Sequence, residues 1–385
     1  MNAADADSKD AFQFFVMDRY WYDDNLFRVP DGLVSDPAVT GRESEDDYVN
    51  RASAGVRVRL DQSRQVFHAD LRIDDVRYDR NDDLNYNGGS ADLLWDWQLG
   101  KPLSGKFFGT FDRAQASLNN YRYFARDIVE TATYGTEVRY ALGSRWRLLA
   151  LGARADTDHG ALDRQLENFE STTGGGGVEY ATPAGTLIAL EYRFTNADFP
   201  EAEALAGAPR GYEERVPGVR VVLPFTEKTR LLLRAGYLDR NYDNPVSDDY
   251  SGGIYNATLQ WEPRSKIEFD FKAWHELRAY SDAESDYFEA DGISITPKWR
   301  PRTKLELSAA FSYENQDYVG SSLVVDAIAE AGREDKMKSA LVSIDYSPRD
   351  LISLGLAYRW LDRESNREFR DYGVNVISAE FKLTF

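Results

Sequence analysis

The feature that most constrains this fold is strict alternation of apolar and polar residues over long runs. The chain ends on such a run, in which every second residue is apolar: Ile377, Ala379, Phe381, Leu383 and Phe385. Successive side chains of a β-strand point to opposite faces, so this run predicts a strand with one apolar and one polar face. Similar runs occur at 187–194, 267–272 and 305–314. No helical period longer than about two turns is present, so the sequence predicts an all-β fold.

The connections between these runs are of two alternating kinds. Short ones are rich in Pro, Gly, Lys and Arg, whereas the intervening loops are polar and mostly longer: 23–46, 79–87, 119–127, 159–168, 199–210, 243–249, 281–286, 319–334 and 364–369. Eight short turns and nine long loops predict an up-and-down antiparallel meander of about 18 strands with both termini on the short-turn side.

Strand length separates a membrane barrel from a soluble sandwich. Many predicted strands have 12–17 residues, whereas soluble strands usually have about 5–6 and a strand crossing a bilayer needs about 9–11. Aromatic residues are abundant at 13% and gather near strand ends, as in the girdles of membrane barrels. We therefore predict a transmembrane up-and-down antiparallel β-barrel, with residues 1–11 as a periplasmic tail and 12–385 as a single barrel domain.

The barrel interpretation also explains a mean hydropathy of −0.55, because only alternate residues need to face lipid. The formal net charge of −19 argues against binding to nucleic acid, whose phosphates would be repelled. The absence of cysteine favours an oxidising compartment. The first residues have no basic segment followed by an apolar one, so we expect a mature chain, without its signal peptide, in the bacterial outer membrane.

The polar face of each strand should line the lumen, and a barrel of 16–18 strands leaves an aqueous channel. Acids and bases in this set are about equal, which disfavours a selectivity ring of one sign and a strongly anionic solute. Such a wall could equally be a salt-bridge lattice that stiffens the barrel. The residues predicted to line the pore are Arg57, Arg59, Asp70, Arg72, Asp74, Asp92, Asp96, Glu137, Arg139, Glu191, Arg193, Arg220, Arg234, Arg240, Glu268, Asp270, Lys272, Glu276, Arg278, Glu306, Arg359 and Arg363.

Motifs for catalysis or metal binding are weak. Three histidines, His68, His159 and His275, lie far apart in the sequence, and no G-x-S-x-G motif is present. The run "GGGG" at 174–177 lacks the Lys-Ser/Thr of a phosphate loop and predicts a bend, a bulge or a close approach. Residues 79–90 resemble a calcium loop, but the sixth position is not Gly and the twelfth is not Glu. We expect no enzymatic activity, no cofactor and no metal site.

Several stretches resemble EpsL-type outer-membrane proteins, which are barrels of exopolysaccharide biosynthesis loci associated with exosortase systems. They include "YWYDDNLFRVPDG", "ALEYRFTNADFPE", "LLLRAGYLDRNYD" and the last strand pair, with "DDNLFR" and "GYLDR" as the most specific parts. The resemblance implies export of an exopolysaccharide chain across the outer membrane together with a periplasmic polysaccharide-export protein. It carries no catalytic residues.

The predicted function is thus a passive conduit for a secreted polysaccharide, surrounded by outer-membrane lipid and lipopolysaccharide. Loops 23–46 and 319–334 could fold inward as a gate. Three alternatives remain open: a general diffusion porin for small polar solutes, a sleeve around another protein, and an outer-membrane enzyme. The outward residues Phe381, Leu383 and Phe385 resemble the terminal signal read by the barrel-assembly machinery, and the last strand should pair with the first to close the sheet.

Overall fold

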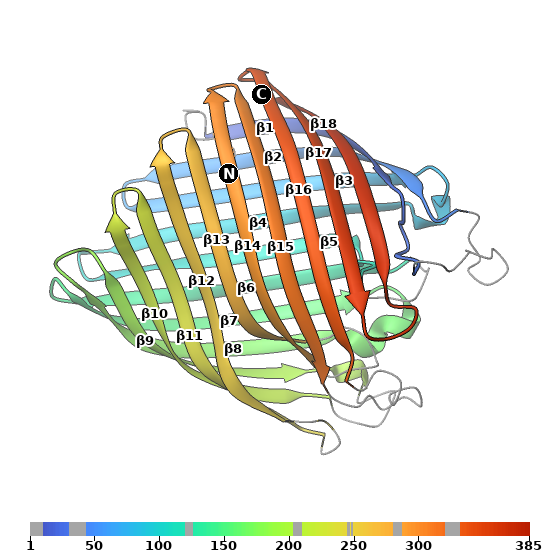
Figure 1. Cartoon of the computed structure of the whole chain (residues 1–385). Helices are drawn as coiled ribbons and strands as arrows, with labels where there is room; N and C mark the ends of the chain where they lie inside the picture. Colours follow the sequence, from blue (N-terminus) through green and yellow to red (C-terminus); the bar gives the residue numbers. More distant parts are fainter. Residues whose placement is uncertain are drawn as a thin grey trace.

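The computed structural model describes residues 11–30, 44–119, 126–202, 210–244, 247, 249–279, 287–319 and 332–385, and these ranges form one barrel (Figure 1). Two short 3₁₀ turns, η2 (Asp82–Leu84) and η3 (Leu162–Glu167), accompany the strands. The strands are β1 (Phe12–Asp23), β2 (Asp47–Gln62), β3 (Gln65–Tyr78), β4 (Tyr86–Leu99), β5 (Leu103–Gln115), β6 (Ile128–Leu142), β7 (Trp146–His159), β8 (Phe169–Ala181), β9 (Leu187–Asp198), β10 (Tyr212–Thr226), β11 (Thr229–Tyr242), β12 (Tyr250–Arg264), β13 (Ile267–Ala279), β14 (Tyr287–Arg302), β15 (Leu305–Val319), β16 (Glu334–Arg349), β17 (Ile352–Ser365) and β18 (Tyr372–Thr384).

The sheet has 18 strands and closes on itself, which confirms the predicted fold class. Each strand pairs antiparallel with its sequence neighbours, and β1 pairs with both β2 and β18. At the seam, Phe14 N donates to Phe385 O over 3.2 Å and Phe385 N donates to Phe14 O over 2.7 Å. Closure removes the edges whose unpaired N–H and C=O groups would be costly in lipid.

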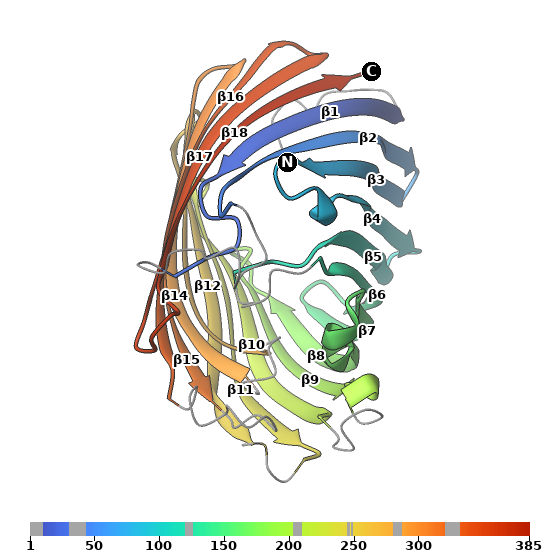
Figure 2. The ribbon, with the colours of Figure 1, turned by 90° about the vertical axis from the view of Figure 1, so that its right-hand side faces the viewer.

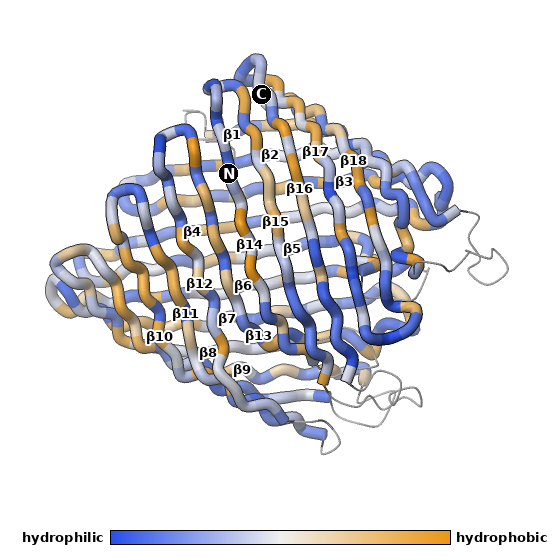
Figure 3. Tube along the Cα trace, in the orientation of Figure 1, coloured by the Kyte–Doolittle hydropathy of each residue, from blue (hydrophilic) through white to orange (hydrophobic). Residues whose placement is uncertain are grey.

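Alternation sorts the side chains of the closed sheet into two faces. Large apolar side chains are exposed on the outer face, as at Leu190 (68%), Leu356 (60%) and Ile377 (59%). On several strands this apolar row gives way to charged residues toward the long loops, as on β7, where Arg154 and Asp156 form an ion pair. Figure 3 shows β15–β18 becoming hydrophilic toward that end. The apolar band thus marks the membrane-spanning part.

The two ends of the barrel differ as the sequence predicts. Tight turns join β2 to β3, β4 to β5 and the later even strands to their successors, whereas the odd strands are followed by long loops. Gly100 and Gly143 occupy tight turns with φ values of +63° and +75°, a backbone conformation that glycine adopts without strain. Short turns are periplasmic and long loops extracellular in barrels of this kind. Residues 1–10 of the predicted tail, and much of loops 23–46 and 319–334, lie outside the described residues.

The glycine run 174–177 lies within β8. Pairing of β8 with β7 and with β9 is continuous through the run, so no bulge occurs there. Gly175 and Gly177 instead permit a close approach, because a Cβ atom would lie 2.8 Å from Tyr192 O at Gly175 and 2.4 Å from Leu190 O at Gly177. The predicted bulge is therefore wrong, and the closeness that Gly175 and Gly177 permit is to the backbone of the paired strand β9.

Most fully buried side chains gather at the long-loop end of the barrel. Val49, Val76 and Tyr86 pack together there, as do Leu238, Tyr250 and Tyr287. Among the described residues, no helix is long and apolar enough to cross a membrane. The buried clusters described above place the packed core at the extracellular mouth of the barrel, the end where Figure 2 shows the long-loop segments.

The seam generates a prediction about assembly. Deleting Phe385 removes two backbone hydrogen bonds to Phe14 and an outward aromatic side chain that is 64% exposed. Because an open seam leaves polar backbone groups in lipid, we expect at least about a threefold loss of folded barrel in the membrane. Heat-modifiable migration on gels of isolated outer membranes measures this. Leu351→Ala, in a periplasmic turn, is the control, and normal insertion of the deletion variant would refute the seam assignment.

Candidate functional site: the lumen wall and its extracellular constriction

The charged residues predicted to line the pore all lie on the inner face of their strands. Arg57 and Asp70 face each other across β2 and β3, with Nε and Oδ2 2.8 Å apart. The remaining members of the predicted set occupy the same face by strand register, from Arg59 on β2 to Arg359 and Arg363 on β17. Their role in transport stays a prediction.

Ion pairs between neighbouring strands connect many of the charged side chains on the inner wall of the barrel. Glu191 accepts from Arg220 Nε at 2.6 Å and also lies within 4.0 Å of Arg193 and Arg234. Glu179 joins the same lattice through Arg147 and Arg220, at 2.6 and 3.1 Å. A second lattice of ion pairs lies on β13–β15 and consists of Lys298, Arg300, Glu268, Asp270 and Glu306. Both the stiffening and the solute-contact interpretations are compatible with such pairing.

Charge is balanced over the whole wall but is sorted around its circumference. β3 and β4 form an acidic sector, where Asp70 and Asp92 lie directly opposite each other. The adjoining sector of β17, β18, β1 and β2 is basic, because its inner face carries more bases than acids. The bases are Arg19, Arg51, Arg57, Arg59, Arg359, Arg363 and Lys382, and the acids are Asp23, Asp47, Asp61 and Glu380. A second arginine-rich sector, β9–β11, lies half-way around the sheet. A solute in the lumen therefore meets distinct sectors rather than a uniform mixture.

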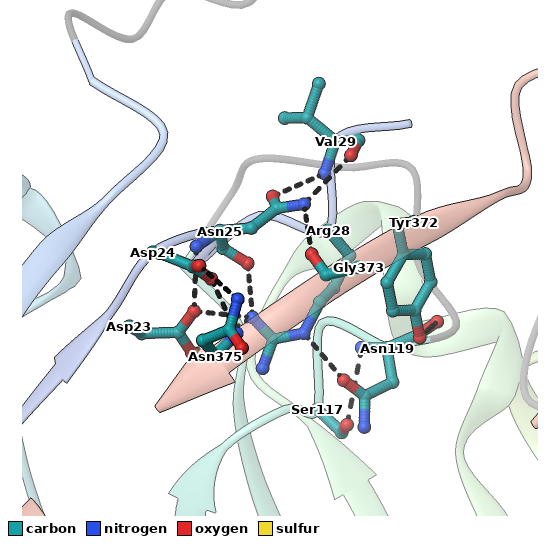
Figure 4. Close-up of polar contacts among 10 residues, drawn as sticks. All are labelled: Asp23, Asp24, Asn25, Arg28, Val29, Ser117, Asn119, Tyr372, Gly373 and Asn375. Carbon is teal, nitrogen blue, oxygen red and sulfur yellow. Dashed lines mark hydrogen bonds and ion pairs between the residues drawn. The ribbon is translucent and has the colours of Figure 1, made fainter. Parts of the chain in front are cut away.

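The segment "DDNLFR" forms a compact clamp at the mouth (Figure 4). Arg28 Nη1 lies 2.9 Å from Asp23 Oδ1, and Arg28 Nε donates to Asn119 Oδ1 over 2.8 Å. Asn25 Nδ2 donates to Val29 O and to Gly373 O. Arg28 adopts a φ of +57°, which is strained for a residue with a side chain. We call residues 23–29 the mouth clamp.

The mouth clamp joins elements that are distant around the barrel. Asn119 follows β5, yet its carbonyl oxygen accepts hydrogen bonds from Arg363 Nη1 at 2.8 Å and Tyr372 OH at 3.1 Å. An apolar cluster completes the contact, formed by Leu26, Phe27, Val29 and Leu84 with Tyr78 and Leu118. The β5 side of the mouth is thus tied to β17 and β18. The described part of loop 23–46 does fold inward.

A second inward displacement narrows the mouth at β12 and β13. Their pairing stops at Tyr255 and His275, although β12 continues to Tyr250 along β11 and β13 continues to Ala279 along β14. Beyond that point Tyr287, on the outer face of β14, packs against Tyr250 on the inner face of β12 and is 2% exposed. The loop ends of β13–β15 therefore lie inside β10–β12, a region that Figure 2 shows from the side.

A buried polar cluster supports the loop between β7 and β8. His159 Nδ1 lies 2.7 Å from Asp127 Oδ2, and Arg164 Nη1 lies 2.7 Å from Glu167 Oε1. Burial would raise the pKa of Asp127, but hydrogen bonds with His159 and from the Ala161 N–H outweigh it and lower the pKa. This carboxylate stabilises the loop above its unfolded pKa of about 3.9, and the contribution is lost as pH falls through the lower folded value. In the described ranges no group of His, Asp and Glu is arranged to hold a metal.

The sequence did not single out Arg19, Arg51 or the clamp residues. In β1 both faces carry large apolar residues, such as Phe14 and Phe15, so alternation does not identify its inner face. The clamp depends on contacts between residues such as Arg28 and Asn119, which are 91 positions apart. The specific "DDNLFR" resemblance was the one signal that pointed to this segment.

Comparisons with known proteins agree with the geometry. The model of the family described as putative beta-barrel porin 2 matches residues 31–385. No curated protein matches the chain significantly. Among solved structures, a BenF-like porin from Pseudomonas fluorescens Pf-5 is 11% identical with a TM-score of 0.51, covering 98% of this chain and 99% of that one.

Two further solved structures are similar. Pseudomonas aeruginosa OccK2 (OpdF), in complex with glucuronate, is 8% identical with a TM-score of 0.50, covering 97% of this chain and 98% of that one. Acinetobacter baumannii OccAB3 is 10% identical with a TM-score of 0.48, covering 97% and 99%. At such low identity the first two of the three structures support the fold alone, and OccAB3 adds no argument.

The mouth clamp generates a prediction about conductance. Arg28→Ala removes the contacts to Asp23 and Asn119, so the clamp should loosen and single-channel conductance should rise by at least about twofold if the clamp limits the pore. Planar-bilayer recordings of the purified barrel measure this change.

Arg64→Ala is the matched control, because Arg64 bonds to Gly100 O in the periplasmic turns, far from the mouth. Its conductance should equal that of the wild type. Equal conductance of wild type and Arg28→Ala would show that the clamp does not limit the pore.

Proposed function

This chain belongs to the putative beta-barrel porin 2 family and is an outer-membrane channel, and from that premise we propose that it exports a polysaccharide to the cell surface. Porin families of this kind are typically not enzymes. The observation that carries the proposal is a wide barrel whose mouth is narrowed by a clamp and by inward-folded strands. A channel that must admit a bulky polymer, yet not leak small solutes, needs both features.

The lumen wall supports this proposal. Many of its charged side chains are held in ion pairs between strands, as around Glu191 and Glu268. Paired charges offer a passing chain many weak contacts and few strong ones, and conduction requires release as well as entry. An exported polymer could slide along such a wall if it is pushed from the periplasm.

The resemblance to EpsL-type proteins supports the same role. One of its two most specific segments, "DDNLFR", forms residues 23–28 of the mouth clamp, and contacts among Asp23, Asn25 and Arg28 hold its fold. The outer membrane has no nucleotide supply, so the driving force would come from synthesis or from a periplasmic polysaccharide-export protein. Partners of this kind belong to the proposal.

A general diffusion porin is the principal alternative. An open porin would pass small sugars continuously, whereas the mouth described above would hold them back. Liposome swelling with mono- and trisaccharides distinguishes the two functions. Free passage of these sugars through the wild-type barrel would contradict the export proposal.

Deletion in the native host tests export directly. We expect surface polysaccharide to fall and the polymer to accumulate in the periplasm, because synthesis continues without an exit. Surface and periplasmic polymer are measured separately, and expression of the intact chain should restore export. Unchanged surface polysaccharide with no trapped polymer would refute the proposal.

A further inference from the structure

Three arginines on the inner wall below the mouth clamp lack the close carboxylate partner that most other wall arginines have. Arg19 on β1 lies directly opposite Arg51 on β2, and both guanidinium groups lie over the Trp21 ring, with centroid distances of 5.8 and 5.7 Å. Arg359 lies on the inner face of β17, which is separated from β1 by β18 alone. Within the described ranges, no carboxylate lies within 4.0 Å of any of the three. We call Arg19, Arg51 and Arg359 the arginine group.

The placement of Arg19 directly opposite Arg51 is unfavourable in itself. Like charges directly opposite each other on paired strands destabilise a sheet. Arg51 Nε is also buried and finds no hydrogen-bond partner among the described residues, which costs desolvation energy. A local conflict of this kind in an otherwise consistent wall points to a functional site.

Two acids on the same inner face, at the mouth ends of β1 and β2, are engaged elsewhere: Asp23 pairs with Arg28, and Asp47 accepts from the backbone N–H groups of residues 79–81. Glu380 lies opposite Arg19 on β18 and attracts it, and Ser378 Oγ lies 3.4 Å from Arg19 Nη2. Asp74, on the neighbouring β3, is already bound to Ser53 and Arg72. By contrast, in the opposite sector Arg193, Arg220 and Arg234 share Glu191. The arginine group therefore keeps a net positive charge that the wall does not neutralise.

We propose that the arginine group binds the carboxylates of an acidic sugar, so that the exported polymer is a carboxylate-bearing polysaccharide. Guanidinium groups bind carboxylates through charge-assisted, often bidentate hydrogen bonds. Trp21 holds two of the guanidiniums in place and lies two residues from Asp23 of the mouth clamp. Each acidic sugar unit of the exported polymer would bind there just before it reaches the constriction. This inference rests on the proposed export function, and it replaces the expectation that a balanced wall disfavours anionic polymers.

Block of ion current tests the subsite in the purified barrel. Trigalacturonic acid and neutral maltotriose are added to the periplasmic side of a planar bilayer. We expect trigalacturonic acid to block at a concentration at least about tenfold lower than maltotriose, and Arg19→Gln/Arg51→Gln to abolish this difference. Glu380→Gln should shift the block in the opposite direction, to lower concentrations, because it removes a competing carboxylate.

The matched control is Arg77→Gln/Arg113→Gln, which removes two outer-face arginines that pair with Asp75 and Glu130. This variant changes the net charge by the same amount as Arg19→Gln/Arg51→Gln. The two sugars should block its current at the same concentrations as in the wild type. Arg19→Lys/Arg51→Lys keeps both positive charges. It should retain part of the block by trigalacturonic acid, which would show that the loss in the Gln variant does not come from misfolding. Equal block by the acidic and neutral sugars in the wild type, or an unchanged preference in the double Gln variant, would refute the subsite.

The two proposals can fail separately. Loss of export on deletion, together with a trapped polymer that contains no acidic sugar, would refute the arginine group as a polymer subsite and leave export intact. An arginine-dependent block in a protein whose deletion leaves surface polysaccharide unchanged would refute export and assign the subsite to a small acidic solute.

Discussion

The need to pair every backbone N–H and C=O group inside the membrane determines the rest of this structure. Lipid offers these groups no hydrogen bonds, so the sheet must close, and it closes between β1 and β18 down to the last residue of the chain. Closure then fixes two faces on every strand. One must be apolar because it meets lipid, and the other is free to carry the charges that would be excluded from an ordinary protein core.

The inner face uses this freedom unevenly. In the membrane-spanning part much of the charge is paired across strands. A barrel of this many strands is expected to enclose an aqueous channel. At the extracellular end the same chain packs tightly, through the mouth clamp, the bridge from Asn119 to Tyr372, and the strand ends of β13–β15. The arginine group lies just below this constriction, where a solute moving outward would slow.

Sequence alternation sufficed to predict the strands, their number, the two unlike rims and the inner position of residues such as Arg57 and Glu191. These properties depend on periodic, local patterns, so they can be recognised from the sequence alone. The inward fold of β13–β15 was not predictable from the sequence. Tyr287 stays on the outer face of β14, as the alternation requires, but it contacts Tyr250 of β12 instead of lipid. Nor was the arginine group, since β1 carries bulky apolar residues on both faces and Arg19 meets Arg51 only through strand pairing.

One-sided cysteine labelling can show whether this wide barrel is constricted at its outer mouth. The chain has no native cysteine, so a single cysteine at inner-face Met17, below the mouth clamp, can be probed with a membrane-impermeant maleimide. If the mouth is constricted, labelling should be slow from outside intact cells and fast when the reagent is supplied to the periplasm. Equally fast labelling from both sides would contradict the constriction, because the mouth would then be open.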